Sequence, residues 1–176
     1  GLYLAFLLLL AKPLGSYMAR VYQGERTFLD PLLRPLEQLI YRAAGVRMED
    51  QMGWQTYTVA VLLVNALGLA VVYALQRFQA ALPLNPQSLG AVAPDTAFNA
   101  AVSFVTNTNW QSYGGETTMS YLTQMLGLTV QNFISAATGM AVLVALVRGL
   151  AHAPQSSLPP TKERGRGGIG NFWVDL

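Results

Sequence analysis

The sequence predicts an all-α membrane protein in which one spanning helix is followed by a hairpin of two further spanning helices. Of its 176 residues, 52% are hydrophobic and only 11% are charged, whereas about 25% of the residues of an ordinary globular chain are charged. Three apolar segments are each long enough to cross the hydrocarbon core of a bilayer. Between the last two lies a run rich in hydroxyl and amide side chains, residues 103–116.

Residues 1–23 are predicted to form the first spanning helix. An apolar run from Leu2 to Ala11 is interrupted by Lys12-Pro13 and resumes at Leu14, which gives about 20 residues, or roughly 30 Å of helix. A cleaved signal peptide is the alternative, but Lys12 splits the apolar core and no small-residue cleavage pattern follows. Because the chain opens at Gly1, directly inside an apolar run, we expect it to be a fragment.

Residues 24–54 are predicted to be a cytoplasmic amphipathic segment. Apolar side chains recur at helical spacing opposite charged and amide ones; they are Leu29, Leu32, Leu33, Leu36, Leu39, Ile40 and Ala43. Pro31 and Pro35 are expected to restrict the helix to the residues after them. Two interpretations stay open: the helix lies on the membrane surface, or it packs on a partner subunit.

The positive charges are distributed unevenly along the chain. Five arginines lie between Arg20 and Arg47, and four basic residues follow from Arg148 onward, but there is no Lys or Arg between Gln79 and Arg148. Short loops rich in Lys and Arg stay in the cytoplasm. The rule therefore predicts that residues 24–54 and the linker 149–176 are cytoplasmic, and that the polar run is entered from outside.

Residues 55–148 are predicted to form the hairpin, and its first spanning helix covers residues 55–78. Asn65 and Gly68 in this helix favour a close, hydrogen-bonded contact with a neighbouring helix. A loop rich in proline follows, and Asp95 or Thr96 offers an N-cap for a short helix over 95–105. About ten residues rise only about 15 Å, so this helix is expected to end near the middle of the membrane.

The last spanning helix is predicted over residues 117–148. It is uncharged until its end, and five polar side chains share one face of an α-helix: Ser120, Gln124, Gln131, Ser135 and Thr138. This pattern favours a face that lines a pore. The alternative is that the same groups join this helix to its neighbours, as polar residues in membrane bundles often do.

The polar run between these helices is a candidate ion selectivity filter, with residues 106–111 as the filter itself. Non-helical backbone at membrane depth survives only where protein covers it or where it lines a water-filled cavity. Successive carbonyl oxygens can replace the hydration shell of potassium, and the carboxyl end of the preceding helix favours a cation. Thr106, Asn107, Thr108 and Asn109 are the predicted potassium-binding residues.

Supporting roles are predicted for the residues that follow. Trp110 and Gln111 are expected to support the filter or to line its vestibule, and Gly114 and Gly115 to let the chain turn outward.

The sequence gives little support for a dinucleotide site, a metal site or a catalytic site. Gly165, Gly167 and Gly170 fit a dinucleotide fingerprint, but no strand precedes them, and a flexible linker is expected instead. His152 is the only histidine and there is no cysteine, so no metal other than potassium and no organic cofactor is predicted. We also expect no catalytic residues and no binding of nucleic acid.

Three specific motifs stand out in the sequence: residues 102–111, Gly115-Glu116-Thr117-Thr118, and residues 127–133. These motifs resemble the potassium-binding A subunit family of the bacterial Kdp potassium pump. Residues 65–69, 83–87 and 173–176 are also similar, so the match runs nearly from end to end.

The resemblance implies a potassium-channel-like protein with four hairpin repeats, of which this chain holds one. It implies that the chain is not itself an enzyme: in this family the P-type ATPase component, called B, hydrolyses ATP, and two small membrane components, called C and F, complete the complex. The implied place is the bacterial inner membrane, where the protein crosses the bilayer several times. From the residues alone, a self-contained potassium channel that assembles as a homotetramer stays open as the alternative.

Overall fold

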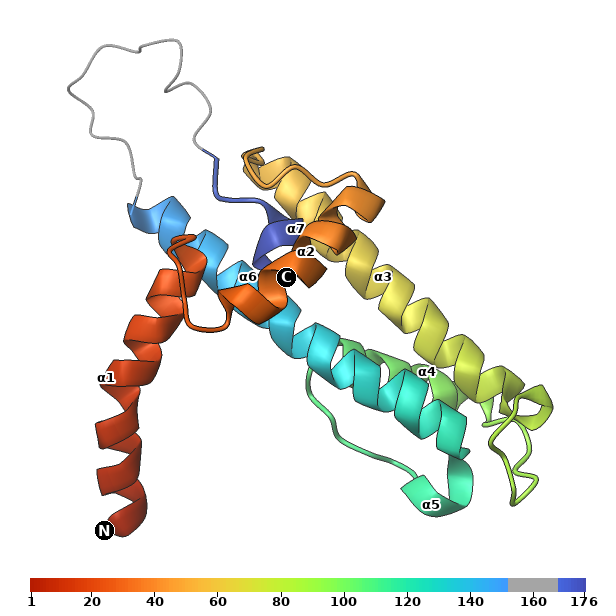
Figure 1. Ribbon diagram of the computed structural model, residues 1–176. Helices are drawn as coiled ribbons and strands as arrows, with labels where there is room; N and C mark the ends of the chain where they lie inside the picture. The colour runs from red at the N-terminus through yellow and green to blue at the C-terminus, as the bar shows by residue number, and fades with distance from the viewer. Residues whose placement is uncertain (152–167) are drawn as a thin grey trace. The chain divides into compact units, whose positions relative to one another are not determined.

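The computed structural model describes residues 1–151 and 168–176, and every element in these residues is helical (Figure 1). Three helices are long and apolar enough to cross a membrane: Leu2–Tyr22, Trp54–Ala81 and Thr123–Ala151. The predicted all-α membrane class is therefore confirmed. The linker residues 152–167, with His152, Gly165 and Gly167, lie outside the described residues.

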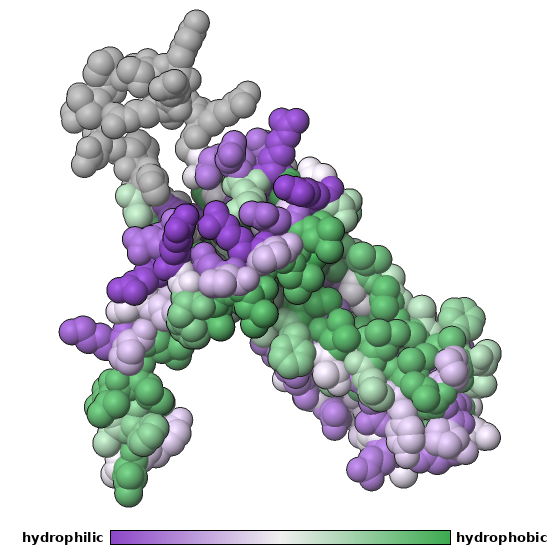
Figure 2. All heavy atoms as spheres, viewed as in Figure 1, coloured by the Kyte–Doolittle hydropathy of each residue, from purple (hydrophilic) through white to green (hydrophobic). Residues whose placement is uncertain are grey.

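The chain divides into two compact units, residues 1–50 with Asp175, and residues 51–174 with Leu176. In the first unit, α1 (Leu2–Tyr22) runs through Pro13 without ending, and none of its residues is buried. Its visible surface is almost wholly apolar (Figure 2). A surface of this kind is suited to contact with lipid.

The second helix of this unit, α2 (Asp30–Ala44), begins earlier than the sequence predicts. Pro31 lies in the first turn, where a missing N–H costs no helical hydrogen bond, and Pro35 is tolerated close behind it. Gly45 ends the helix in the left-handed conformation, with φ 67°. The expectation that both prolines precede the helix is wrong.

The second unit is built on two long antiparallel helices, α3 (Trp54–Phe78) and α6 (Val130–Ala151) (Figure 1). The hydroxyl of Tyr57 donates to the carbonyl of Ala141 over 2.8 Å. Gly68 packs closely against Gln131, because a Cβ built on Gly68 would overlap with Gln131 Oε1. Asn65 does not reach a neighbour as predicted, since its amide donates to Val61 within the same helix.

Short elements fill the end of the unit opposite Trp54. They are η1 (Gln79–Ala81), α4 (Pro94–Val105), α5 (Gly115–Thr118) and the π-helical segment η2 (Thr123–Thr129). One hydrophobic cluster joins them to α3; it contains Val72, Val92, Ala97, Ala100, Ala101, Phe104, Met119 and Leu128. In Figure 2 the visible surface of this end mixes hydrophilic and hydrophobic residues.

The predicted helix 117–148 differs from the structure at its start. After α5 the chain is extended at Met119, with φ −110° and ψ 127°, and helix resumes beyond Ser120. In η2 the hydroxyl of Thr129 donates to the carbonyl of Gln124, five residues earlier. The wider π turn shifts the faces of the helix on either side of it.

The last nine residues are packed rather than extended as a linker. The short helix α7 (Phe172–Asp175) places Phe172 in a second cluster with Tyr57, Ala60, Ala141 and Ala145. The backbone of Met52 donates to Gly170 and accepts from Ile169. Residues 168–176 of the predicted linker therefore pack on the unit, because the aromatic side chain of Phe172 lies between two helices; the role of residues 149–176 as a cytoplasmic linker stays a prediction.

Candidate functional site

The helix α4 lies against α3 and is held there by polar contacts at its first turn. The amide of Gln76 donates to the carbonyls of Val72 and Ala97, and the Arg77 guanidinium donates to the carbonyl of Val92. The predicted N-caps are wrong: Ala93 is the N-cap residue and Pro94 is the first helical residue. Asp95 lies in the first turn instead, where its charge complements the helix dipole.

The carboxyl end of α4 is closed by the loop that follows it. The carbonyl of Val102 accepts from Thr106 N–H at 2.9 Å, and that of Phe104 accepts from Asn107 N–H at 3.3 Å. Ser103 accepts from two further amides, Thr108 N–H at 2.9 Å and Asn109 N–H at 3.2 Å. The loop therefore satisfies three of the last four carbonyls of the helix, which would otherwise have no partner, and leaves that of Val105 without a donor among the described residues.

Two residues of this loop have left-handed backbone conformations. Asn107 has φ 55° and Asn109 has φ 56°, and asparagine tolerates this conformation better than most residues other than glycine. The side chains bond to one another: Asn109 Nδ2 donates to Asn107 Oδ1 at 3.0 Å, and the hydroxyls of Thr106 and Thr108 lie 2.9 Å apart. The four side chains are thus used to shape the loop.

The backbone carbonyls of Thr106, Asn107, Thr108 and Asn109 accept no hydrogen bond from any residue in the described part of the chain. The next carbonyl differs, because Trp110 accepts from the hydroxyl of Ser103 at 2.9 Å. Ser103 is only 1% exposed. These four carbonyl oxygens therefore have no donor in the described residues, as is also true of the Val105 carbonyl before them, and a buried serine holds the carbonyl that follows them.

The predicted supporting residues have varied surroundings. The side chain of Trp110 is 49% exposed, and Gln111 is also exposed. Gly114 accepts from the amides of Thr117 and Thr118, and a Cβ on it would lie 2.7 Å from the hydroxyl of Thr117. Gly114 and Gly115 are not among the residues with positive φ, so close approach, rather than a left-handed turn, explains the glycine at 114.

The polar face predicted to line a pore is mostly buried within the unit. Ser120, Gln131, Ser135 and Thr138 are each at most 6% exposed. The hydroxyl of Ser135 reaches Asn107 Oδ1 at 3.4 Å, whereas Thr138 donates to Ile134. These contacts favour the alternative interpretation, in which the face joins helices and supports the loop from α6.

Gln79 is a residue of the site that sequence reasoning missed. It is fully buried, and its amide donates to the carbonyls of Gly90 and Thr118 at 2.6 and 2.8 Å. Its Oε1 accepts from the backbone of Ser120 and from the hydroxyl of Thr123. The sequence does contain a signal for this role. Two amide side chains, Gln76 and Gln79, lie at the end of an apolar span, where polar groups often bond to neighbouring helices.

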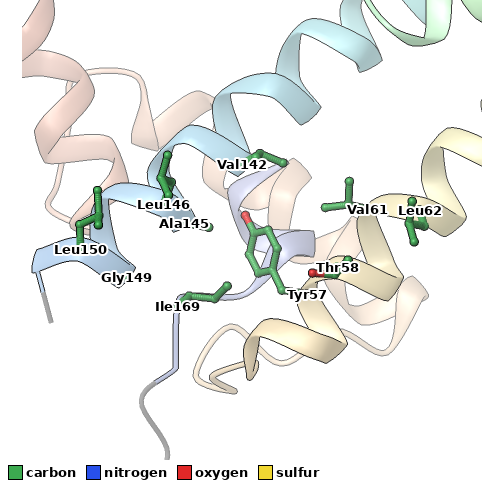
Figure 3. A pocket seen from close by; sticks show the side chains of 10 residues that line it. All are labelled: Tyr57, Thr58, Val61, Leu62, Val142, Ala145, Leu146, Gly149, Leu150 and Ile169. Carbon is green, nitrogen blue, oxygen red and sulfur yellow. The ribbon is translucent and has the colours of Figure 1, made fainter. Parts of the chain in front are cut away.

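One pocket of the unit is apolar and lies away from the loop. It has a volume of about 420 Å³ and lies between α3, α6 and Ile169 (Figure 3). The two hydroxyls on its wall are already used, since Tyr57 donates to Ala141 and Thr58 to Trp54. A potassium ion needs several oxygens, so this pocket does not suit it.

In the described residues, no three His, Cys, Asp or Glu side chains lie close enough to hold a metal ion. The oxygen-rich loop at the end of α4 is therefore the feature of this unit best suited to an ion. Its donor set consists of uncharged carbonyl oxygens, which suit a monovalent cation better than a transition metal.

The chain is similar to known proteins over its whole length. The family model "Potassium-transporting ATPase A subunit" matches residues 1–176. The chain is 58% identical over 176 residues to the potassium-transporting ATPase potassium-binding subunit of Chromobacterium violaceum, and 59% identical to those of Sorangium cellulosum and Methylobacterium radiotolerans. Each match covers all of this chain but 27%, 28% and 29% of the respective relative. The chain belongs to the potassium-transporting ATPase A subunit family.

Proposed function

We propose that this chain forms part of the potassium-binding and translocating subunit of an ATP-driven uptake pump, and that residues 106–111 are one segment of its selectivity filter. The main support is the run of four carbonyls, at Thr106, Asn107, Thr108 and Asn109, that have no hydrogen-bond donor in the described residues. Carbonyl oxygens of this kind replace the hydration shell of potassium in channel filters.

The contacts around the loop support the same role. Side-chain bonds among the four residues, together with Ser103 and Ser135, hold the backbone and leave its carbonyls available. A single loop supplies only part of a ring of ligands, so further filter segments have to come from elsewhere in the complete protein.

The proposed partners are the ATP-hydrolysing P-type component, B, and the small membrane components, C and F, of a Kdp complex in a bacterial inner membrane. In this proposal the chain binds and conducts the ion but does not hydrolyse ATP. The names of the relatives describe an ATPase subunit, which favours the pump over a self-contained homotetrameric channel.

The test is to replace Gln111 by Arg in the whole protein and to measure the potassium concentration that half-saturates ATP hydrolysis by the assembled complex. A fixed positive charge about 8 Å from a bound potassium ion costs about 2 kcal/mol at an effective dielectric constant near 20, so the half-saturating concentration should rise at least about tenfold. The matched control is Gln111→Asn, which keeps the amide and should leave the value nearly unchanged. Equal potassium dependence of the Arg variant and the parent would contradict the proposed filter.

A further inference from the structure

The helix α2 presents an apolar face that no described residue covers. Leu29, Leu32, Leu33, Leu36, Leu39, Ile40, Ala43 and Ala44 fall within an arc of about 140° at 100° per residue. Leu32 is 75% exposed and Leu39 is 65% exposed, and no residue of α2 is buried. An isolated helix of 15 residues is only marginally stable in water, so its apolar face requires a partner.

The connection to α1 places the beginning of α2 at the end of a spanning helix. The ring of Phe28 packs on that of Tyr17, with centroids 5.4 Å apart. Tyr17 lies five residues before the end of α1 at Tyr22, which corresponds to about 7.5 Å along the helix axis. If α1 crosses the bilayer, Phe28 therefore lies at the level where aromatic side chains gather between headgroups and hydrocarbon.

The face of α2 opposite the apolar arc carries arginines. Arg34 and Arg42 lie on either side of Gln38 at 100° per residue, and the flanks hold both signs of charge, with Arg20, Arg26 and Arg47 against Glu25, Glu49 and Asp50. Asp30 accepts from the backbone and the hydroxyl of Thr27, and these hydrogen bonds lower the pKa of its carboxyl group. This carboxylate is thus occupied at the start of the helix, and Arg34 and Arg42 lie opposite the apolar arc.

We propose that α2 lies in the membrane interface, with the side chains of Leu32, Leu36 and Ile40 among the lipid chains and with Arg34 and Arg42 toward anionic headgroups. Amphipathic helices bury their apolar face about 5–10 Å into the boundary between headgroups and chains. Each arginine close to an anionic surface adds to the binding. The helix is an in-plane anchor that follows the first span.

The absence of cysteine from these 176 residues simplifies a direct test, in which any cysteine elsewhere in the whole protein is first replaced by serine. Single cysteines at Leu36 and Ile40, and at Gln38 on the opposite face as the matched control, are spin-labelled in the whole protein in vesicles of phosphatidylethanolamine and phosphatidylglycerol. Collision of each label with oxygen, which concentrates in hydrocarbon, is compared with collision with a water-soluble nickel complex. We expect oxygen to dominate at 36 and 40, and nickel at 38.

Two results would overturn the proposal. Nickel access at all three positions would mean that α2 lies in water, and labels at 36 and 40 that are immobile and shielded from both reagents would mean that it docks on protein. In vesicles of phosphatidylcholine alone we expect shallower labels at 36 and 40. Unchanged depth there would contradict the contact of Arg34 and Arg42 with anionic headgroups.

Discussion

Ser103 contributes four hydrogen bonds to the loop that carries the candidate filter. Its carbonyl accepts from the amides of Thr108 and Asn109 and from the hydroxyl of Thr106, and its hydroxyl donates to the carbonyl of Trp110. Any residue can supply the first three bonds through its backbone, but the fourth needs a side-chain hydroxyl. The side chain of Ser103 therefore holds the carbonyl that follows the four candidate ligands.

We expect Ser103→Ala to destabilise the protein by about 1 kcal/mol, since one buried hydrogen bond is lost and the Trp110 carbonyl is left without its donor. The carbonyl of Trp110 also becomes free to turn, so discrimination between potassium and sodium should fall. Thermal unfolding and the ion dependence of activity measure these effects. Ser112→Ala, in an exposed part of the same loop, is the control, and identical behaviour of the two variants would contradict the role given to Ser103.

Asn107 combines a left-handed backbone with a side chain that accepts from both Asn109 and Ser135. A β-branched residue at φ 55° costs about 1–2 kcal/mol, so Asn107→Val should weaken potassium binding more than Asn107→Gly. Glycine adopts this conformation freely and loses only the side-chain bonds. Potassium titrations of both variants measure the two affinities. If the Gly variant binds potassium as weakly as the Val variant, the left-handed backbone at position 107 is not the cause of the loss.

Gln79 connects elements that are far apart in the sequence but meet at the end of α3. Its amide group contacts the loop before α4 through Gly90, the end of α5 through Thr118, and the start of the last helix through Ser120. The position of the filter loop therefore depends on α3 as well as on α4.

We expect Gln79→Leu to lower stability by about 2 kcal/mol, because the buried amide of Ser120 loses its acceptor and two partly buried carbonyls, at Gly90 and Thr118, lose their donor, at a cost of about 1–3 kcal/mol for each group that stays buried. The change should appear as a lower unfolding temperature in detergent or nanodiscs. The control is Gln87→Leu, since Gln87 is exposed and makes one long bond, 3.4 Å, to Tyr121. Equal losses in the two variants would show that the buried network contributes nothing specific.

The π-helical segment η2 explains why the polar face of the last helix differs from the predicted one. Offsets of four, seven, four and three residues place Ser120 to Thr138 on one face only if the helix is α-helical throughout. The backbone of Thr123–Thr129 is π-helical and has more residues in each turn than an α-helix, so residues before and after it no longer follow one register. Such a turn depends on contacts with other elements, for example Thr123 with Gln79, which no local pattern reveals.

At the scale of the whole molecule, the sequence predicted what depends on apolar length and on strong local signals. The three spans, the short helix before the loop and the amphipathic helix near residues 30–44 all follow from periodicity and composition. It did not predict contacts that depend on distant residues, such as Ser103 with Trp110, Gln79 with Thr118, or Phe172 with Tyr57. The predicted filter residues do form one loop, but their binding of potassium stays a prediction.

The packing of the terminal segment is a feature of the whole second unit, because it joins the end of the described chain to the start of α3. Phe172 is fully buried against Tyr57, with ring centroids 5.4 Å apart, and Met52 exchanges backbone hydrogen bonds with Ile169 and Gly170. The aromatic contact and the backbone pairing lie next to each other, so each should depend on the other.

We therefore expect Phe172→Ala to release residues 168–176 from the helices, since truncation of a buried Phe removes about 3–5 kcal/mol of packing. Hydrogen exchange should become faster at the amides of Met52 and Ile169, whose partners are lost, and should stay unchanged in α4. Trp173→Ala is the matched control, because Trp173 is 38% exposed and its loss should have a smaller effect. If the amides of Met52 and Ile169 stay protected in the Phe172 variant, the backbone pairing alone holds the segment. If exchange instead becomes faster throughout α3, Phe172 supports the unit as a whole and not only its terminal segment.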